Sequence, residues 1–212
     1  MIRTSFIIFI FLIIGCTDHV KKLPILGNYD INTNYENGVE KIDTVFHYIK
    51  EFAFVNQDSL VVTNQTFDDK IYITDFFFTS CPSICPIMKG QMLRVYETFQ
   101  EEGSVVFLSH TIDPEYDTVA LLRDYAERLG VESNKWHFVT GDKQAIYKIA
   151  QLSYMSVVAD EPSAPGGYIH SGRFILVDKK RHIRGVYDGT DQEDVNILIA
   201  DIKILLEEYA IK

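Results

Sequence analysis

The sequence predicts an α/β fold in which helices cover a central sheet, with a closing antiparallel hairpin and a C-terminal helix. Three observations support this prediction. Residues 71–78 are apolar and aromatic almost without a break, as in a buried central strand. After them, apolar runs typical of strands alternate with stretches of helical spacing. Two strand-like runs then follow each other near the end of the chain, which indicates a hairpin at one side of the sheet.

The first half of the chain leads into the central strand. Residues 45–55 mix aromatic, apolar and polar side chains and are expected to be extended. A turn at 56–58 separates them from a short strand over 60–62. The central strand over 71–78 follows, and apolar residues at helical spacing then predict a helix over 88–100.

Capping residues mark two helices in the middle of the chain. Asp117-Thr118 opens a helix that runs through Leu129, and Gly130 closes it as a typical C-cap. Asp142 caps a second helix that runs to about Gln151. Strands are expected over 105–108 and 136–139, before each of these helices. Residues 157–167 contain two Pro and two Gly and are expected to form a loop.

The end of the chain predicts a hairpin followed by an amphipathic helix. Strands over 174–177 and 183–186 flank a polar turn at 178–182. Thr190 and Glu193 have the spacing of a capping box, which predicts the start of a helix. One face of that helix is apolar throughout, formed by Val195, Leu198, Ile199, Ile202, Leu205, Leu206 and Tyr209.

Composition excludes two broad classes of protein. The chain has 212 residues, of which 47% are hydrophobic and 24% charged, so wholesale disorder is excluded. It carries 20 basic and 30 acidic residues, a formal net charge of −10. Nucleic-acid binding needs clustered Lys and Arg to neutralise phosphates, so no nucleic-acid partner is expected.

The N-terminus has the pattern of an export signal. Residues 6–14 are all apolar, which is too short for the ~20 residues that span a bilayer but fits a secretory signal. The run ends in Ile13-Ile14-Gly15-Cys16, which resembles the bacterial lipobox, where the cysteine is lipidated and becomes the first residue of the mature chain. The alternative is a plain signal peptide with an unmodified Cys16.

These patterns divide the chain into three parts. Residues 1–15 are interpreted as a lipoprotein signal peptide, 16–40 as a tether with the segment leading into the domain, and 41–212 as the folded domain. No later stretch is long and apolar enough to cross a membrane. The protein is therefore expected in the bacterial cell envelope, anchored to the membrane by lipid, with the domain outside the cytoplasm.

Two of the three cysteines form a closely spaced pair. Lipidation of Cys16 would leave Cys81 and Cys85, and a disulfide across so short a loop stabilises a fold only weakly. The pair is therefore interpreted as chemical rather than structural. Cysteines directly after a buried strand, within this order of elements, match the thioredoxin-like plan, although the order alone would fit other α/β folds.

The prolines around the pair suggest its local geometry. Pro86 suits the first position of a helix, which would place Cys85 at the N-cap and Cys81 in the preceding loop. Because a helix N-terminus lowers the pKa of a thiol, Cys85 is expected to be the more thiolate-like residue. The two sulfurs could close a disulfide or bind one soft metal ion. The structural alternative is a pair of buried, inert thiols.

Two thiolates would leave a metal site open to a third ligand. Cu(I) accepts soft ligands at low coordination number, a Cys₂His set also suits Cu(II), and structural zinc prefers four ligands. Six histidines are available. His170 is the best candidate by position, because it follows the loop over 157–167 and has Gly166, Gly167 and Gly172 nearby.

Four motifs, taken together, resemble the Sco/SenC family. The first is the cysteine segment DFFFTSCPSICP and the second is a T-x-D-P-x-x-D-T stretch. The third is Tyr168-Ile169-His170-Ser171, whose histidine follows Cys85 by 85 residues (170 − 85), and the fourth is GVYDGT. The likeness extends from about Leu23 to Leu206. The first, second and fourth motifs occupy residues 75–86, 111–118 and 185–190.

The resemblance implies a thioredoxin-like fold and a copper site formed by Cys81, Cys85 and His170. It also implies a metallochaperone that supplies copper to the binuclear copper centre of cytochrome c oxidase, with the copper-receiving subunit or another apo copper protein as partner. One residue departs from the pattern: many members carry Asp before the histidine, and this chain has Ile169.

Asp113 is a further candidate near the site. An Asp-Pro pair after a strand is commonly a turn former, and that is the first interpretation of Asp113-Pro114. The alternative is that Asp113 shapes the site from behind the metal ligands.

Four functions remain open at this point. A copper metallochaperone and a thiol–disulfide oxidoreductase both need Cys81 and Cys85, and the second uses the pair without a copper-delivery role. A peroxiredoxin-like peroxidase is disfavoured, because those enzymes place Thr three residues before the reactive cysteine and this chain has Phe78. A lipid-tethered binding module would leave the cysteine pair unexplained.

Overall fold

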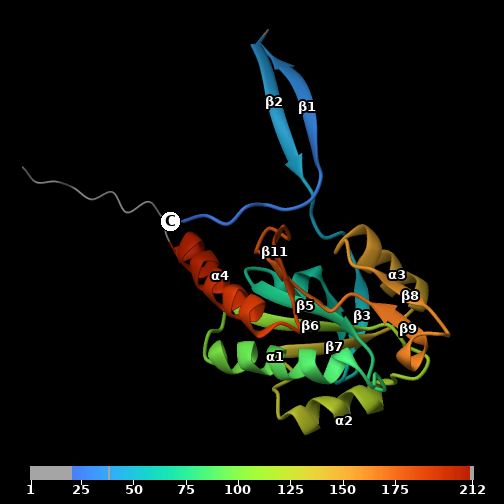
Figure 1. The fold of residues 1–212 in the computed structure, drawn as a ribbon. Helices are drawn as coiled ribbons and strands as arrows, with labels where there is room; N and C mark the ends of the chain where they lie inside the picture. Colours follow the sequence, from blue (N-terminus) through green and yellow to red (C-terminus); the bar gives the residue numbers. More distant parts are fainter. Residues whose placement is uncertain (1–20, 38, 211–212) are drawn as a thin grey trace, which may run out of the picture.

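The computed structural model describes residues 21–37 and 39–210 (Figure 1). The predicted signal peptide and Cys16 lie outside the described residues. Within the described ranges, no helix is both long and apolar enough to span a bilayer.

A seven-stranded mixed sheet forms the centre of the fold, in the order β11-β10-β5-β6-β7-β3-β4. The three middle strands are parallel, and the strands on either side of them pair antiparallel. The strands are β3 (Ala53–Asn56), β4 (Val61–Thr63), β5 (Ile71–Phe77), β6 (Val105–Thr111), β7 (Trp136–Thr140), β10 (Arg173–Val177) and β11 (Ile183–Asp188).

Strand β5 is the centre of this sheet, as its apolar sequence predicts. All seven of its residues are buried, because helices cover both faces of the sheet. It pairs in parallel with β6, with Thr74 opposite Leu108, and antiparallel with β10, with Thr74 opposite Ile175. The loops that follow parallel strands meet at one edge of a sheet. The cysteine loop after β5 and the Asp-Pro turn after β6 are therefore neighbours.

Four helices pack on the sheet, with α1, α2 and α4 on one face and α3 on the other (Figure 1). The predicted caps of the two middle helices are confirmed. Thr118 accepts from the amide of Leu121, Asp142 accepts from that of Ala145, and Gly130 closes its helix at φ +69°. The helices are α1 (Ile84–Thr98), α2 (Val119–Leu129), α3 (Lys143–Leu152) and α4 (Gln192–Ala210).

The start of α4 differs from the prediction. Thr190 does not form a capping box with Glu193, because its hydroxyl donates to Asp188. The carboxylate of Asp191 instead accepts from the amide of Glu193 at 2.8 Å. An Asp one residue before the helix is as good a cap as Thr, so the sequence pattern offered two competing starts.

The predicted loop over 157–167 contains a strand. Residues Val158–Asp160 form β8, which pairs antiparallel with β9 (Tyr168–His170) so that Val158 lies opposite His170. A single turn of 3₁₀ helix, Pro165–Gly167, lies between them. This small two-stranded sheet holds His170 in place.

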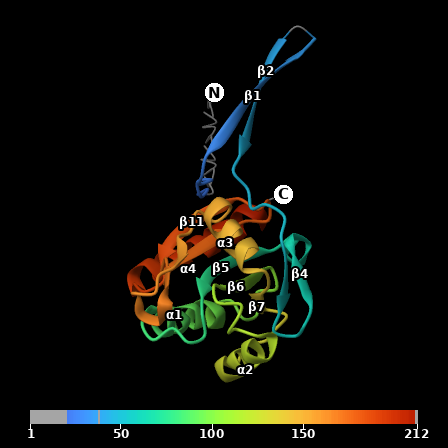
Figure 2. The ribbon, with the colours of Figure 1, turned by 90° about the vertical axis from the view of Figure 1, so that its right-hand side faces the viewer.

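A long hairpin precedes the domain and projects away from it (Figures 1 and 2). It consists of β1 (Tyr29–Glu36) and β2 (Val39–Phe46), and every described residue in both strands is exposed. Residues 45–55 are predicted to be extended, but only the two ends of this segment are strands. Strand β2 ends at Phe46, and β3 begins at Ala53.

The hairpin is amphipathic. Because side chains alternate along a strand, the register that pairs Tyr29 with Phe46 separates the residues into two faces. One face is largely apolar and contains Tyr29, Ile31, Tyr35, Ile42 and Phe46; the other is largely polar and contains Asp30, Asn32, Asn34, Lys41 and Asp43. The sequence pattern does not foresee this hairpin, because it packs against no core that would impose a strong apolar signal.

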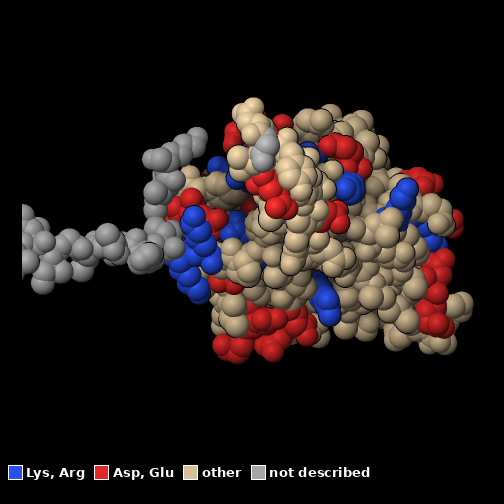
Figure 3. All heavy atoms as spheres, turned by 90° about the horizontal axis from the view of Figure 1, so that it is seen from above, with Lys and Arg blue, Asp and Glu red and all other residues tan. Residues whose placement is uncertain are grey.

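Charge is distributed over the surface in keeping with the acidic composition. Figure 3 shows acidic side chains in several separate groups, with basic side chains between them. No single basic surface dominates this face.

Candidate metal centre

The two cysteines lie in the connection from β5 to α1. Helix α1 begins at Ile84, with Ser83 as the preceding N-cap residue. The prediction of Cys85 at the N-cap and Pro86 at the first helical position is therefore wrong by two residues. The first four amides of a helix have no intrahelical partner, so Pro86 is tolerated at the third position as well as at the first. Cys81 precedes the helix and Cys85 belongs to its first turn.

His170 lies against the cysteines. Its Nε2 is 3.3 Å from the Sγ of Cys85, and its ring is nearly perpendicular to that of Phe78 with the ring centroids 5.9 Å apart. The ligand atoms of Cys81, Cys85 and His170 all lie within 4.8 Å of one another. All three residues are buried, and both cysteines are free.

A glycine allows the loop before His170 to close on the site. Gly166 has φ +82°, a conformation that other residues rarely adopt. A Cβ on Gly166 would lie 2.7 Å from the ring of Phe78, so a side chain there would push the loop away. The ring of Phe78 in turn packs on Tyr168 at 5.2 Å between centroids. Gly166 thus permits the close approach that brings His170 to the sulfurs.

The two thiols differ in acidity. Burial raises the pKa of Cys81, but hydrogen bonds from the backbone amides of Ser83 and Cys85 outweigh it and leave that pKa lowered. Burial also raises the pKa of Cys85, where it dominates, and the neighbouring Cys81 sulfur adds to the effect. The expectation that Cys85 is the more thiolate-like residue is therefore wrong. The amides at the start of α1 point at Cys81, whereas Cys85 turns its sulfur into the core.

This difference predicts which cysteine reacts first. At about pH 7, iodoacetamide should modify Cys81 before Cys85, because the thiolate is the nucleophile and a lowered pKa leaves more of it at neutral pH. Peptide mapping by mass spectrometry after short exposure measures the order. In guanidinium-unfolded protein the preference should disappear, and faster modification of Cys85 in the folded protein would contradict the assignment.

His170 is in the form that binds a metal. Burial lowers the pKa of its imidazole, and the negative charge of Asp75 opposes this only in part. The imidazole is therefore neutral at physiological pH, as a metal ligand must be.

The other described histidines are placed differently. His110 is fully buried and stacks on Phe76 at 5.0 Å between centroids, and burial lowers its pKa to about 3. His137 contacts the side chain of Asn56. His47 and His182 lie at the base of the exposed hairpin and in the turn before β11, and His19 lies outside the described residues.

Asp117 has a role that its sequence position does not reveal. Besides preceding α2, its buried carboxylate accepts hydrogen bonds from the amide and hydroxyl of Thr79 and from the hydroxyl of Thr111. It thereby ties the loop before Cys81 to the end of β6. The signal available in the sequence is that Asp, Thr and Thr occur in two of the resembling motifs.

Asp113 does not belong to the three-residue group of possible ligands in the described structure. Its backbone carbonyl accepts from the amides of Tyr116 and Asp117, as expected of a turn former. Its carboxylate also interacts with the Tyr168 hydroxyl, whose pKa is raised to about 12 by burial and by that carboxylate. Asp113 is thus connected with the loop that carries His170, and a role in shaping the site stays a proposal.

A buried ion pair lies between β5 and α1, behind the cysteines. Lys89 Nζ is 2.6 Å from the carboxylate of Asp75, and both side chains are almost fully buried. Lys89 also donates to Ser109 Oγ at 3.1 Å and lies 4.2 Å from the centroid of the Phe77 ring. Lys89 follows Cys85 by one helical turn, and its positive charge acts to lower the pKa of that thiol. The pair is not predicted from the sequence, although a charged residue inside each apolar run is a visible signal.

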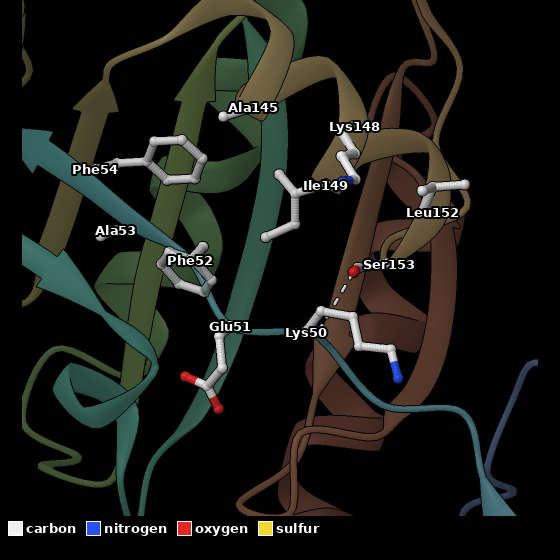
Figure 4. Close-up of a pocket in the computed structure, with 10 residues that line it drawn as sticks. All are labelled: Lys50, Glu51, Phe52, Ala53, Phe54, Ala145, Lys148, Ile149, Leu152 and Ser153. Carbon is white, nitrogen blue, oxygen red and sulfur yellow. Dashed lines mark hydrogen bonds between the residues drawn. The ribbon is translucent and has the colours of Figure 1, made fainter.

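A cleft away from the cysteine pair lacks the thiol and imidazole groups found there. It has a volume of about 440 Å³ and lies between residues 50–54 and α3 (Figure 4). Phe52, Phe54 and Ile149 form its apolar part, with Lys50 and Lys148 at its edge. No cysteine or histidine lines it, so it provides no soft metal ligand or thiol.

Comparison with known proteins supports the resemblance. The family model described as SCO1/SenC matches residues 40–207. The chain is 26% identical over 162 residues to the SCO1 protein homolog of Bacillus subtilis, covering 76% of this chain and 84% of the relative. It is 28% identical over 143 residues to a protein of Stutzerimonas stutzeri whose name proposes that it binds copper, covering 65% and 67% of the two chains.

Two solved structures share the fold. One is a SCO1/SenC family lipoprotein from Bacillus anthracis, with a TM-score of 0.69, 26% identity, and coverage of 76% of this chain and 95% of that one. The other is BsSco, described as a Sco-family cytochrome c oxidase assembly protein with a disulfide switch. Its TM-score is 0.66 at 27% identity, over 75% of this chain and 93% of BsSco. The thioredoxin-like α/β prediction is confirmed, and because the family model covers well over half of its length, the chain belongs to the SCO1/SenC family.

Proposed function

We propose that Cys81, Cys85 and His170 bind one copper ion, and that the protein delivers copper to, or prepares the cysteines of, the binuclear copper site of cytochrome c oxidase. The observation that carries this proposal is the convergence of the three donor atoms within 4.8 Å, in a chain of the SCO1/SenC family. Copper is the cargo of this function rather than a permanent part of the protein.

The donor set favours copper over other common metals. Two thiolates and a neutral imidazole are soft or intermediate ligands, which suit Cu(I) and Cu(II), whereas Mg²⁺ and Ca²⁺ need oxygen ligands. Structural zinc takes four ligands, and among the described residues the group contains three. The raised pKa of Cys85 does not oppose this, because a metal displaces the thiol proton on binding.

The relatives support the class of partner. The name of the Stutzerimonas protein proposes copper binding, and BsSco is described as belonging to cytochrome c oxidase assembly proteins. By similarity, the partner of this chain is the copper-receiving subunit of cytochrome c oxidase or another apo copper protein.

The central test is a Cu(I) titration of the reduced protein, followed by X-ray absorption. We expect one copper per chain, with sulfur and nitrogen neighbours. His170→Ala should lose the nitrogen neighbour and weaken copper binding, while disulfide exchange by the cysteine pair is retained. His182→Ala is the matched control, because His182 lies in the turn before β11, and it should bind like the wild type. Unchanged copper affinity in His170→Ala would remove that residue from the site.

A thiol–disulfide oxidoreductase is the second candidate function. It is favoured by a specific observation: Cys81 has a lowered pKa, and the free Cys85 lies beside it as a resolving thiol. Such an activity could reduce the cysteines of an apo copper protein before the metal is inserted. Failure of the reduced protein to bind Cu(I) would leave this function in first place.

The location of the protein is part of the proposal. We propose that Cys16 carries a lipid and holds the domain at the bacterial membrane, outside the cytoplasm. The Gly15-Cys16 motif and the similarity to a Bacillus anthracis lipoprotein support it. Replacing Cys16 by Ser should move the protein from the membrane fraction to the soluble fraction, and its retention in the membrane fraction would contradict lipidation.

A further inference from the structure

Among the three candidate ligands, Cys81 is the thiol that a partner can reach. A recess of about 180 Å³ opens beside it, and Cys81 and His170 line this recess while Cys85 does not. The exposed fraction is 8% for Cys81 and 3% for Cys85. A disulfide partner arriving from outside therefore meets Cys81 before Cys85.

The walls of the recess are apolar. Apart from Cys81 and His170, the polar side-chain groups in its lining are the hydroxyls of Ser83 and Tyr168, and the lining contains no charged residue. The remaining lining residues are apolar or aromatic and come from the strand end, from α1 and from the loop before His170: Phe78, Ile84, Ala164, Pro165, Tyr168 and Ile169.

The apolar character of the recess reaches the surface at Ile169. This lining residue is 44% exposed. Two charged side chains contact Tyr168, and both have partners. Lys143 lies over its ring and is paired with Asp160 at 2.9 Å, and the carboxylate of Asp113 interacts with its hydroxyl. Exposed apolar residues around a reactive atom are a feature of contact sites for other molecules.

We infer that this recess is the partner-contact site, and that it receives one uncharged apolar or aromatic side chain lying next to the accepting cysteine of the partner. Its volume is comparable with the roughly 150 Å³ cavity in another protein that holds one benzene ring. A charged side chain would lose its hydration in the recess without finding a partner, which is costly. The inference rests on the proposed function, because it describes the partner of that same site.

Small disulfides can report on the recess without an identified partner. The Cys81 thiolate attacks one sulfur of the reagent, forms a mixed disulfide and releases one thiolate. Cys85 then loses its proton to solvent and attacks the Cys81 sulfur, which releases the second thiolate. The protein is oxidised by two electrons and the reagent is reduced by two. The rate of the first step measures how well the organic part of the reagent fits beside Cys81.

The experiment compares four reagents with the reduced protein. They are 4,4′-dithiodipyridine (aromatic, uncharged), 5,5′-dithiobis(2-nitrobenzoate) (aromatic, anionic), hydroxyethyl disulfide (small, uncharged) and cystamine (small, cationic). Each rate is divided by the rate of the same reagent with glutathione, and the series is repeated at high salt to screen long-range charge. We expect normalised rates for 4,4′-dithiodipyridine that exceed those for the other three by about tenfold.

Two variants locate the effect. Ile169→Asp places a charge on the rim and should lower the normalised rate for 5,5′-dithiobis(2-nitrobenzoate) further and raise that for cystamine. Ala164→Leu fills the recess and should remove the preference for the aromatic, uncharged reagent. Ile197→Asp, on the exposed face of α4, is the matched control and should behave like the wild type.

The results separate this inference from the proposed function. Equal normalised rates for the four reagents, or equal effects of Ile169→Asp and Ile197→Asp, would overturn the inference. Copper stoichiometry is measured on the same proteins. Wild type that binds no copper but retains the reagent preference would overturn the copper proposal and leave the contact site standing.

Discussion

Replacement of either cysteine by serine should lower the affinity for Cu(I) by about a thousandfold or more, which is ~4 kcal/mol. A serine hydroxyl is a hard, neutral ligand, whereas the thiolate that it replaces is soft and negatively charged. Each variant would leave a single sulfur with His170, and these three residues are the group that the described structure brings together. Competition with a chromophoric Cu(I) chelator measures the loss. Copper affinity within tenfold of the wild type would contradict a two-sulfur site.

The same two variants should differ sharply in disulfide exchange. In Cys85→Ser, Cys81 can still attack a disulfide, but no neighbouring thiol resolves the product, so a stable mixed disulfide should accumulate. In Cys81→Ser, the remaining Cys85 is buried and has a raised pKa, so little product should form. Intact-protein mass spectrometry distinguishes the two outcomes. A stable adduct on Cys81→Ser instead would reverse the assigned order of the cysteines.

Removal of Lys89 should destabilise the fold strongly. Lys89→Met leaves the carboxylate of Asp75 fully buried without its ion pair, and breaking one partner of a buried pair costs about 3–5 kcal/mol. The loss is measured as the change in the free energy of unfolding in urea. Lys203→Met, at an exposed position on α4, is the control and should change stability little.

A double replacement tests whether the cost comes from the unpaired charge. Asp75→Leu combined with Lys89→Met removes both charges and should recover much of the stability lost in Lys89→Met, because an apolar pair of similar volume needs no compensation. If the free energy of unfolding of Lys89→Met stays within about 1 kcal/mol of the wild-type value, the ion pair does not contribute to the stability of the fold. If the double variant is no more stable than the single one, the loss arises from packing rather than from charge.

The structural features that depend on neighbouring residues in the sequence agree with the prediction. The apolar run at β5, the caps at Thr118 and Asp142 and the αL residue Gly130 each act within one or two turns of the chain. Local sequence contains the information for such features, because the interacting groups are neighbours in sequence. The exposed β1–β2 hairpin lacks a buried face, and its weak pattern was correspondingly missed.

The errors at the site have a different origin. The order of acidity in the cysteine pair depends on which sulfur receives the amides of Ser83 and Cys85 and which one turns into the core. Pro86 is compatible with more than one starting point of α1, so the sequence permitted both arrangements. The position of Asp117 in the sequence indicates only the start of a helix. Its hydrogen bonds from Thr79 and Thr111 form because β5 and β6 pack side by side.

Residue types and spacing predicted the α/β layers and led to the interpretation of Cys81 and Cys85 as a chemically active pair, and the resemblance between motifs implied His170 as their companion. Those conclusions depend on chemistry that each residue carries with it, or on a likeness between motifs. The three-dimensional fold decided which thiol faces outward, how Gly166 lets the histidine loop close, and that Asp75 and Lys89 pair behind the site. These features depend on burial and on contacts between distant segments, and neither exists before the chain has packed.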